Sequence, residues 1–145
     1  WCNPADHDHY SYITRMESLI AEYPDITFVF MTGHPNGDGE NIIGNTAYHC
    51  HATVTEHCRT HNRYCIDYWS IETHGMDDVY YPYANDNGVA GSVSFYYNWM
   101  NSHVSGSDYY SCSCAHTTNQ RITCNRIAYA AWWIWARIAG WSGVW

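Results

Sequence analysis

Apolar residues follow a helical spacing in some stretches of the chain and form short continuous runs in others. Between residues 9 and 23 they recur every three or four positions, with Asp8 as a candidate N-cap and Pro24 as a stop, which predicts a helix. Residues 26–31 form a continuous apolar run with β-branched and aromatic members, flanked by turn residues. This run predicts a strand that is buried on both faces.

The rest of the chain repeats this order before it becomes irregular. A second helix is predicted at about 45–62 and a second strand at about 64–69. Residues 70–120 are aromatic and irregular, with one helical turn expected near 95–102. A final helix ends at Gly140, which occupies the C′ position. The apolar stripe of this helix consists of Ile127, Ala130, Ala131, Ile134 and Ile138.

The order of these elements predicts an α/β fold. Helices that alternate with buried strands are typical of a parallel sheet with crossover helices. Two parallel strands cannot form a self-sufficient sheet, so we expect further strands from a preceding segment or from another chain. We therefore expect residues 1–145 to form a single, partial domain.

Charge and apolar run length exclude two classes of partner. The chain carries 14 acidic residues against six basic ones, all arginine, and a net charge of −8 with histidine neutral. An acidic chain without a basic stripe is unsuited to nucleic acid or to an anionic membrane surface. No apolar stretch reaches the roughly 18 residues of a membrane span, so none is predicted.

The seven cysteines indicate an oxidising compartment, and we expect the protein to be extracellular. Cys112 or Cys114 is expected to pair with Cys124 and to close a short loop. Cys50 and Cys58 cannot pair within one helix, because eight residues at 1.5 Å rise separate them by about 12 Å.

Several segments, in order along nearly the whole chain, resemble a secreted bacterial family of SGNH-hydrolase-like proteins. The Met-Thr-Gly-His sequence that ends at His34 and the tryptophan-rich final helix are the most specific. The matching segments are residues 1–2, 23–34, Cys58, 66–72, 83–87, 112–116 and 132–141. The resemblance implies a flavodoxin-like, SGNH-type three-layer sandwich around a parallel sheet that lacks its N-terminal strand or strands.

The same resemblance implies a serine esterase-like activity. A histidine in the loop before the final helix acts as the base in such folds, and His116 occupies that position. Ser113 stands where the companion acid is usual, so Asp108, with Asp67 as another option, is the candidate to orient the imidazole. The nucleophilic serine motif has no counterpart in this sequence, so the activity requires a preceding segment that carries it. The structural alternative is a histidine held by backbone hydrogen bonds.

Four polar residues are candidates for substrate binding. His34 follows the first strand at the edge of the sheet where open α/β sheets bind ligands. Asp67 and Glu72 flank the end of the second strand, and Asn85 belongs to one of the matching segments. Carboxylates in such positions bind carbohydrate hydroxyls, or they cap neighbouring helices.

No metal site or cofactor is predicted. His57 and His61 are four residues apart and share a helical face, but a third ligand is needed. The chain contains no Cys-x-x-Cys-His haem motif and no glycine-rich nucleotide motif.

Two functions therefore remain open, besides a lower-ranked metal-binding role. The first is an extracellular SGNH-like esterase that acts on a carbohydrate or another ester. The second is a non-catalytic extracellular subunit that binds carbohydrate or self-associates into a filament. The eight Trp, 14 Tyr and three Phe suit either sugar stacking and interfaces or a core that contains a single leucine.

Overall fold

The computed structural model describes residues 8–44, 46–112 and 121–143. Helices and strands follow in the order α1 (His9–Glu22), β1 (Val29–Met31), α2 (Ala47–Thr60), β2 (Tyr64–Ile66), α3 (Tyr68–Thr73), β3 (Val89–Ala90), β4 (Val93–Ser94), α4 (Phe95–Asn101) and α5 (Arg121–Ile138).

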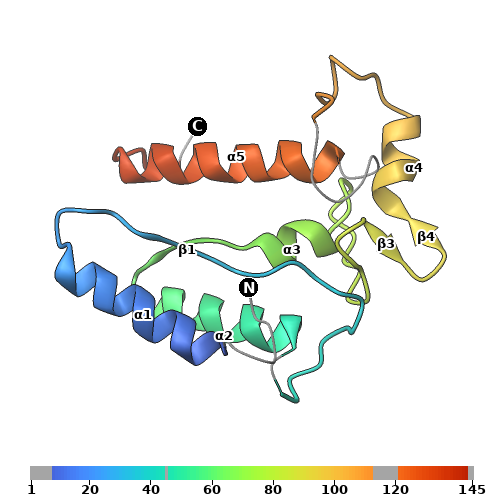
Figure 1. The fold of residues 1–145 in the computed structure, drawn as a ribbon. Coiled ribbons are helices and arrows are strands. Elements are labelled where there is room, and N and C mark those ends of the chain that lie inside the picture. The colour runs from blue at the N-terminus through green and yellow to red at the C-terminus, as the bar shows by residue number, and fades with distance from the viewer. Residues whose placement is uncertain (1–7, 45, 113–120, 144–145) are drawn as a thin grey trace.

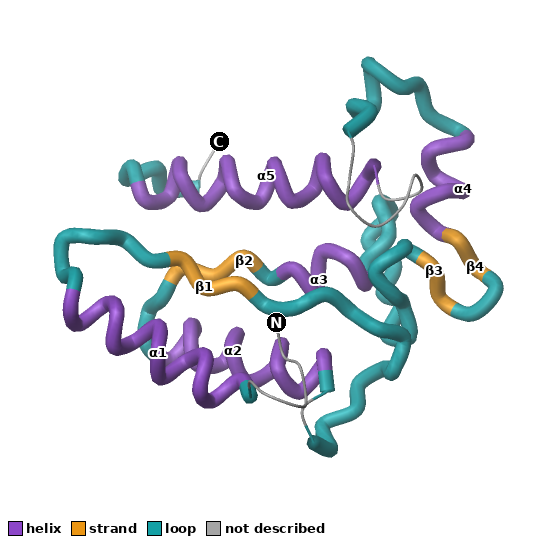
Figure 2. Tube along the Cα trace, in the orientation of Figure 1, coloured by secondary structure: helices purple, strands orange, loops and turns teal. Residues whose placement is uncertain are grey.

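A pair of parallel strands runs through the middle of the molecule. Val29, Phe30 and Met31 of β1 pair with residues 64–66 of β2. α1 and α2 lie on one side of these strands and α5 lies on the other (Figures 1 and 2). Within the described residues this sheet has two strands, and β3 and β4 form a separate antiparallel pair. The α/β order predicted from the sequence is thus present, whereas the three-layer sandwich with a larger sheet remains a prediction.

The helices predicted near both ends of the chain are confirmed. α1 begins where Asp8 accepts a hydrogen bond from the Ser11 amide at 2.6 Å, and it ends just before Pro24. The second strand is shorter than predicted and the prediction for its end is wrong, because Asp67 caps a new helix. Its carboxylate accepts the Ser70 amide at 3.3 Å, which starts α3 directly after β2.

Two apolar clusters form the core. The first lies between α1, α2 and β1, with Phe30 and Val54 fully buried at its centre. The α1 residues that face it are Tyr12, Ile13, Met16 and Ile20, which are the helical apolar stripe of the sequence. An ion pair supports this packing from outside, since Glu17 of α1 bridges Arg63 at 2.7 Å and His57 of α2 at 2.8 Å.

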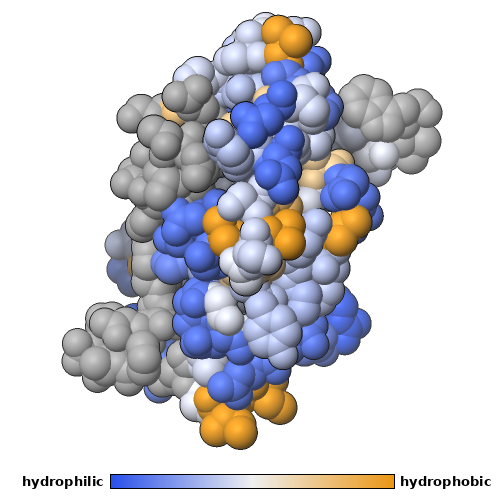
Figure 3. All heavy atoms as spheres, turned by 90° about the vertical axis from the view of Figure 1, so that its right-hand side faces the viewer, coloured by the Kyte–Doolittle hydropathy of each residue, from blue (hydrophilic) through white to orange (hydrophobic). Residues whose placement is uncertain are grey.

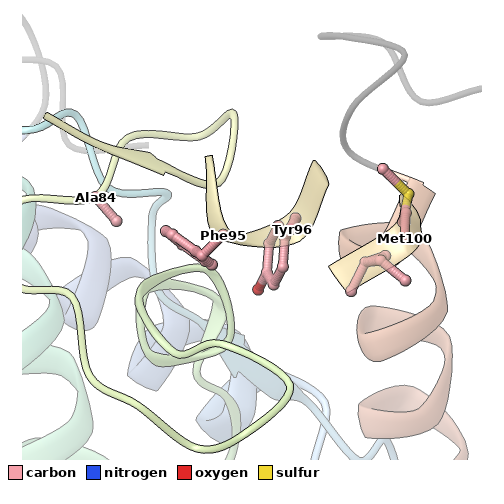
Figure 4. Packing of buried hydrophobic residues seen from close by; sticks show 5 residues of the cluster. Ala84, Phe95, Tyr96 and Met100 are labelled. Atoms are coloured by element: carbon pink, nitrogen blue, oxygen red, sulfur yellow. The ribbon is translucent and has the colours of Figure 1, made fainter. Parts of the chain in front are cut away.

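The second cluster lies between α4, the start of α5 and the loop that contains Ala84. It contains Ala84, Phe95, Tyr96, Met100 and Ile122, of which Figure 4 labels the first four. The hydroxyl of Tyr96 points away from α4 and donates to the Ile71 carbonyl of α3 at 2.5 Å. Arg126 of α5 donates to that same hydroxyl at 3.0 Å. Arg126 therefore ties α5 to the core.

α5 is amphipathic, but its outer face is aromatic. Ile134 of the predicted stripe is buried toward β2 and α3, whereas Ile138 at the end of the stripe is exposed. On the outer face Tyr129, Trp132 and Trp135 are each about two-thirds exposed, and the Arg137 guanidinium lies over the Trp133 ring. The face around α4, seen in Figure 3, is instead mostly hydrophilic with small separate apolar patches.

None of the helices in the described ranges has the length and apolarity needed to cross a bilayer. Cys50 and Cys124 each take part in a disulfide. Cys124 is one of the predicted disulfide cysteines, but its proposed partner Cys114 lies outside the described residues. The pairing of Cys112 or Cys114 with Cys124 therefore stays a prediction.

Candidate ligand-binding site

A cavity of about 380 Å³ lies at the carboxyl end of β1. Three parts of the chain form it: the first turns of α1, the end of β1 with the residues after it, and α3 with the loop that precedes β3. Its lining residues are Ser11, Tyr12, Arg15, Met31, Thr32, Gly33, His34, Tyr68, Glu72 and Asp86. This is the sheet edge at which open α/β folds bind ligands.

Glu72 is the most unusual side chain of the cavity. It is 2 % exposed, and its Oε2 atom has no hydrogen-bond partner among the described residues. Burial, together with the charge of Asp86, raises the pKa of Glu72 to about 8, while a hydrogen bond with Tyr68 acts in the opposite direction. Glu72 is therefore mostly protonated at neutral pH, and its carboxyl group carries a hydroxyl that can donate a hydrogen bond.

The start of α3 is fixed to the end of β1 by Thr32. The hydroxyl of this buried residue donates to the Asp67 carboxylate at 3.0 Å and accepts the amide of Trp69 at 3.0 Å. Tyr68 and Glu72 follow one helical turn apart, so both side chains lie on the face of α3 that lines the cavity. Thr32 and Asp67 thereby position the two α3 residues of the site.

The Asp67 carboxylate is occupied by hydrogen bonds that hold the fold together. Besides Thr32 and the Ser70 amide, it accepts a hydrogen bond from His51 Nδ1 at 2.8 Å, and the His51 ring stacks on Trp69. Burial opposes ionisation of Asp67, but the hydrogen bonds from His51 and Ser70 lower its pKa overall. Asp67 does not line the cavity, so the helix-capping role expected as its alternative is the one observed.

His34 enters the cavity from the residues that follow β1. Its ring Nδ1 lies 3.1 Å from the Pro35 carbonyl oxygen. Because a carbonyl can only accept, Nδ1 carries the proton of this hydrogen bond. The contact orients the ring, and His34 and Glu72 are the two predicted substrate-binding residues that the structure brings together in one cavity.

The remaining predicted residues lie elsewhere. The side-chain oxygen of Asn85 accepts the amides of Asn87 and Val89, which folds the loop that presents Asp86. The Asp108 carboxylate accepts the Val104 amide at 2.7 Å in the exposed loop between α4 and α5. Its proposed partner His116 lies outside the described residues, so the His116–Asp108 pair and the substrate role of Asn85 stay predictions.

Several lining residues were missed by the sequence reasoning. Ser11 and Arg15 are four residues apart on α1, a spacing that places both on one helix face. Their apolar neighbours identified the helix, but nothing in the sequence indicated that its polar face meets the end of β1. The predicted residue Asn85 lies in a loop that reaches the cavity, but its neighbour Asp86 is the residue that lines it.

The cavity offers hydrogen-bonding groups of both charges beside two tyrosines. Arg15 lies at its exposed side and takes part in none of the described ion pairs. Within the described ranges, no group of three or more His, Cys, Asp or Glu residues has the arrangement of a metal site. This chemistry suits an uncharged or weakly acidic ligand that is rich in hydroxyl groups.

The chain matches no protein-family model, no curated protein and no solved structure. The resemblance to SGNH-hydrolase-like proteins therefore depends on the sequence motifs alone.

Proposed function

We propose that this chain is an extracellular SGNH-like domain whose cavity binds a carbohydrate or a related hydroxyl-rich ester. The observation that carries the proposal is the unpartnered Oε2 atom of Glu72, a buried residue that lines the cavity. A buried polar atom without a partner costs about 1–3 kcal/mol. A ligand hydroxyl or carbonyl that bonds to Glu72 would remove this cost.

The other lining residues support a sugar-like ligand. Tyr12 and Tyr68 provide aromatic surface, and Ser11 and Asp86 provide polar groups on two sides of the cavity. A volume of about 380 Å³ is near the small end of the range for ligand cavities. It accommodates a small ligand or the terminal unit of a longer chain.

Binding can be tested by titrating the full chain with paired acetylated and unacetylated oligosaccharides in a calorimeter. We expect Glu72→Ala to weaken binding about 10- to 100-fold, because one buried hydrogen bond is lost. Glu72→Gln should retain most of the affinity, since its amide also donates. The wild-type affinity should fall as pH rises past about 8, whereas that of Glu72→Gln should not.

The matched control is Glu22→Gln, which changes an exposed carboxylate at the end of α1. It should bind as the wild type does. Wild-type affinity from Glu72→Ala, or no saturable binding to any oligosaccharide of the panel, would overturn the proposal.

Ester hydrolysis is a second candidate for the same cavity. Its specific support is that a serine hydroxyl, an imidazole and a carboxyl group line one cavity, in Ser11, His34 and Asp86. These are the group types that serine esterases combine. Release of nitrophenol from nitrophenyl acetate by the wild type tests the activity. Its loss in His116→Ala would support the base implied by the family resemblance, and its loss only in His34→Ala would place the base in the described cavity.

The non-catalytic alternative is a subunit that associates with further copies of itself. It is favoured by the exposed aromatic side chains along the outer face of α5.

A further inference from the structure

Two cysteines outside the cavity are thiols that lie against each other. Cys58 is in the last turn of α2, and Cys65 is the middle residue of β2. Both are reduced in the structure. Cys58 is a buried member of the first core cluster, and Cys65 is a partly buried residue that packs against this cluster. A side-chain hydrogen bond joins the two thiols.

The chain between the two residues turns back sharply. The Arg63 amide donates to the Cys58 carbonyl at 2.8 Å, which closes the turn between α2 and β2. The pairing of Cys65 with Phe30 of β1 fixes the other end. Helix and strand thus hold the two thiols together without a covalent bond between them, while Cys50 and Cys124 each take part in a disulfide.

We propose that Cys58 and Cys65 are a redox pair, which a small peroxide oxidises to a disulfide between α2 and β2. This inference is independent of the proposed ligand binding, because neither cysteine lines the cavity. A small peroxide is the fitting oxidant because Cys58 is 4 % exposed, which hinders attack by a bulky disulfide.

The two thiols have different roles in this reaction. The hydrogen bond from Cys65 lowers the pKa of Cys58, with burial opposing this and the Arg63 charge supporting it. The same hydrogen bond and burial raise the pKa of Cys65. Cys58 therefore carries the thiolate, which is the nucleophilic form.

The reaction then balances in two steps. The Cys58 thiolate attacks one peroxide oxygen, the oxygen–oxygen bond breaks, and hydroxide leaves as Cys58 becomes a sulfenic acid. The Cys65 sulfur next attacks the Cys58 sulfur, and the sulfenic hydroxyl leaves as water with the Cys65 proton. The two sulfurs lose two electrons in total, and the peroxide is reduced.

Peptide mapping of the full chain treated with hydrogen peroxide tests the proposal. Trypsin cuts after Arg59 and Arg63, between the two cysteines, and chymotrypsin separates Cys65 from Cys112. Cleavage after Glu56 by a glutamate-specific protease separates Cys58 from Cys50. We expect a disulfide-linked pair of peptides that contains Cys58 and Cys65, and an intact mass that falls by two hydrogen atoms. Peroxide-treated protein that keeps both thiols, or joins either one to a different cysteine, would overturn the proposal.

Serine variants test the order of the steps. In Cys65→Ser the reaction should stop at the sulfenic acid, which a dimedone adduct on Cys58 reveals. Cys58→Ser should give no adduct at Cys65, because burial still raises the pKa of that thiol when Cys58 is absent. Circular dichroism verifies that each variant is folded. If a variant does not fold, the peptide map of the peroxide-treated wild type still tests whether the disulfide forms. An adduct at Cys65 in place of Cys58 would contradict the assigned roles.

Discussion

Burial of Glu72 lowers the stability of the fold, and it also leaves a carboxyl oxygen that a ligand can bind. Its side chain is buried beside Asp86, and only the hydrogen bond with Tyr68 moderates its raised pKa. Natural sequences rarely keep a buried carboxyl with an unpartnered oxygen unless it serves another purpose. Replacement of Glu72 should therefore reveal both the energetic cost and its pH dependence.

We expect Glu72→Gln to stabilise the protein in alkaline solution. The pKa of Glu72 is about 8 in the folded state and 4.5 in the unfolded state. Between these values the folded state holds a proton that the unfolded state has released, so the stability of the wild type falls as pH rises from 4.5 to 8. Each pKa difference of one corresponds to about 1.4 kcal/mol, which limits the effect to roughly 5 kcal/mol.

Urea unfolding at several pH values measures this effect. At pH 9 we expect Glu72→Gln to exceed the wild type by about 2–4 kcal/mol, since relaxation reduces the full cost of burial. Below pH 4.5 the two should differ little. Glu22→Gln should follow the wild type throughout, and a Glu72→Gln variant with the same pH dependence as the wild type would contradict the burial of a protonated Glu72.

At the scale of elements, the loop that presents Asp86 depends on the start of α4. Gly88 of this loop is buried with a φ of +65°, and a Cβ atom there would lie 2.3 Å from Cδ2 and 2.8 Å from Cγ of Tyr96. Tyr96 is fully buried and bonded to α3, so its ring has no room to move. The loop and α4 therefore fit together only when residue 88 is glycine.

Gly88→Ala should destabilise the fold by about 2–4 kcal/mol, from overpacking and from the left-handed backbone together. Gly91→Ala is the matched control, because Gly91 has a φ of +59° with no atom near its Cβ position. It should cost only about 1 kcal/mol, the backbone contribution alone. Thermal unfolding of both variants gives the comparison, and equal losses would show that contact with Tyr96 contributes nothing.

The same elements show what the sequence could and could not predict. α1 was predictable because its apolar stripe, the Asp8 cap and Pro24 all agree. The strand predicted to reach Trp69 ends at Ile66, because capping by Asp67 outweighs the strand preference of Tyr68 and Trp69. Local patterns do not report which distant segments meet, and so His34 and Glu72 were found from strand ends while Ser11 and Arg15 were not.

At the scale of the whole molecule, the outer face of α5 is the surface on which self-association of the protein depends. One side of this helix packs on β2 and α3, and it lies at the outside of the molecule in Figure 1. Trp132 is 71 % exposed and Trp135 is 66 % exposed. Aromatic residues are enriched at the centres of protein interfaces, where each buries roughly 150–250 Å². A second copy of the chain is the partner that the self-association alternative requires.

If α5 mediates this association, wild-type protein should form larger species as its concentration rises. The double substitution Trp132→Gln and Trp135→Gln should then leave a monomer, with little change in the unfolding temperature because both side chains are exposed. Tyr110→Gln is the control, since Tyr110 is 64 % exposed in the loop before α5. Sedimentation velocity over a range of concentrations distinguishes the outcomes. A wild type that stays monomeric, or a double variant that associates like the Tyr110 control, would reject α5 as the self-association surface and leave ligand binding in the cavity as the function to pursue.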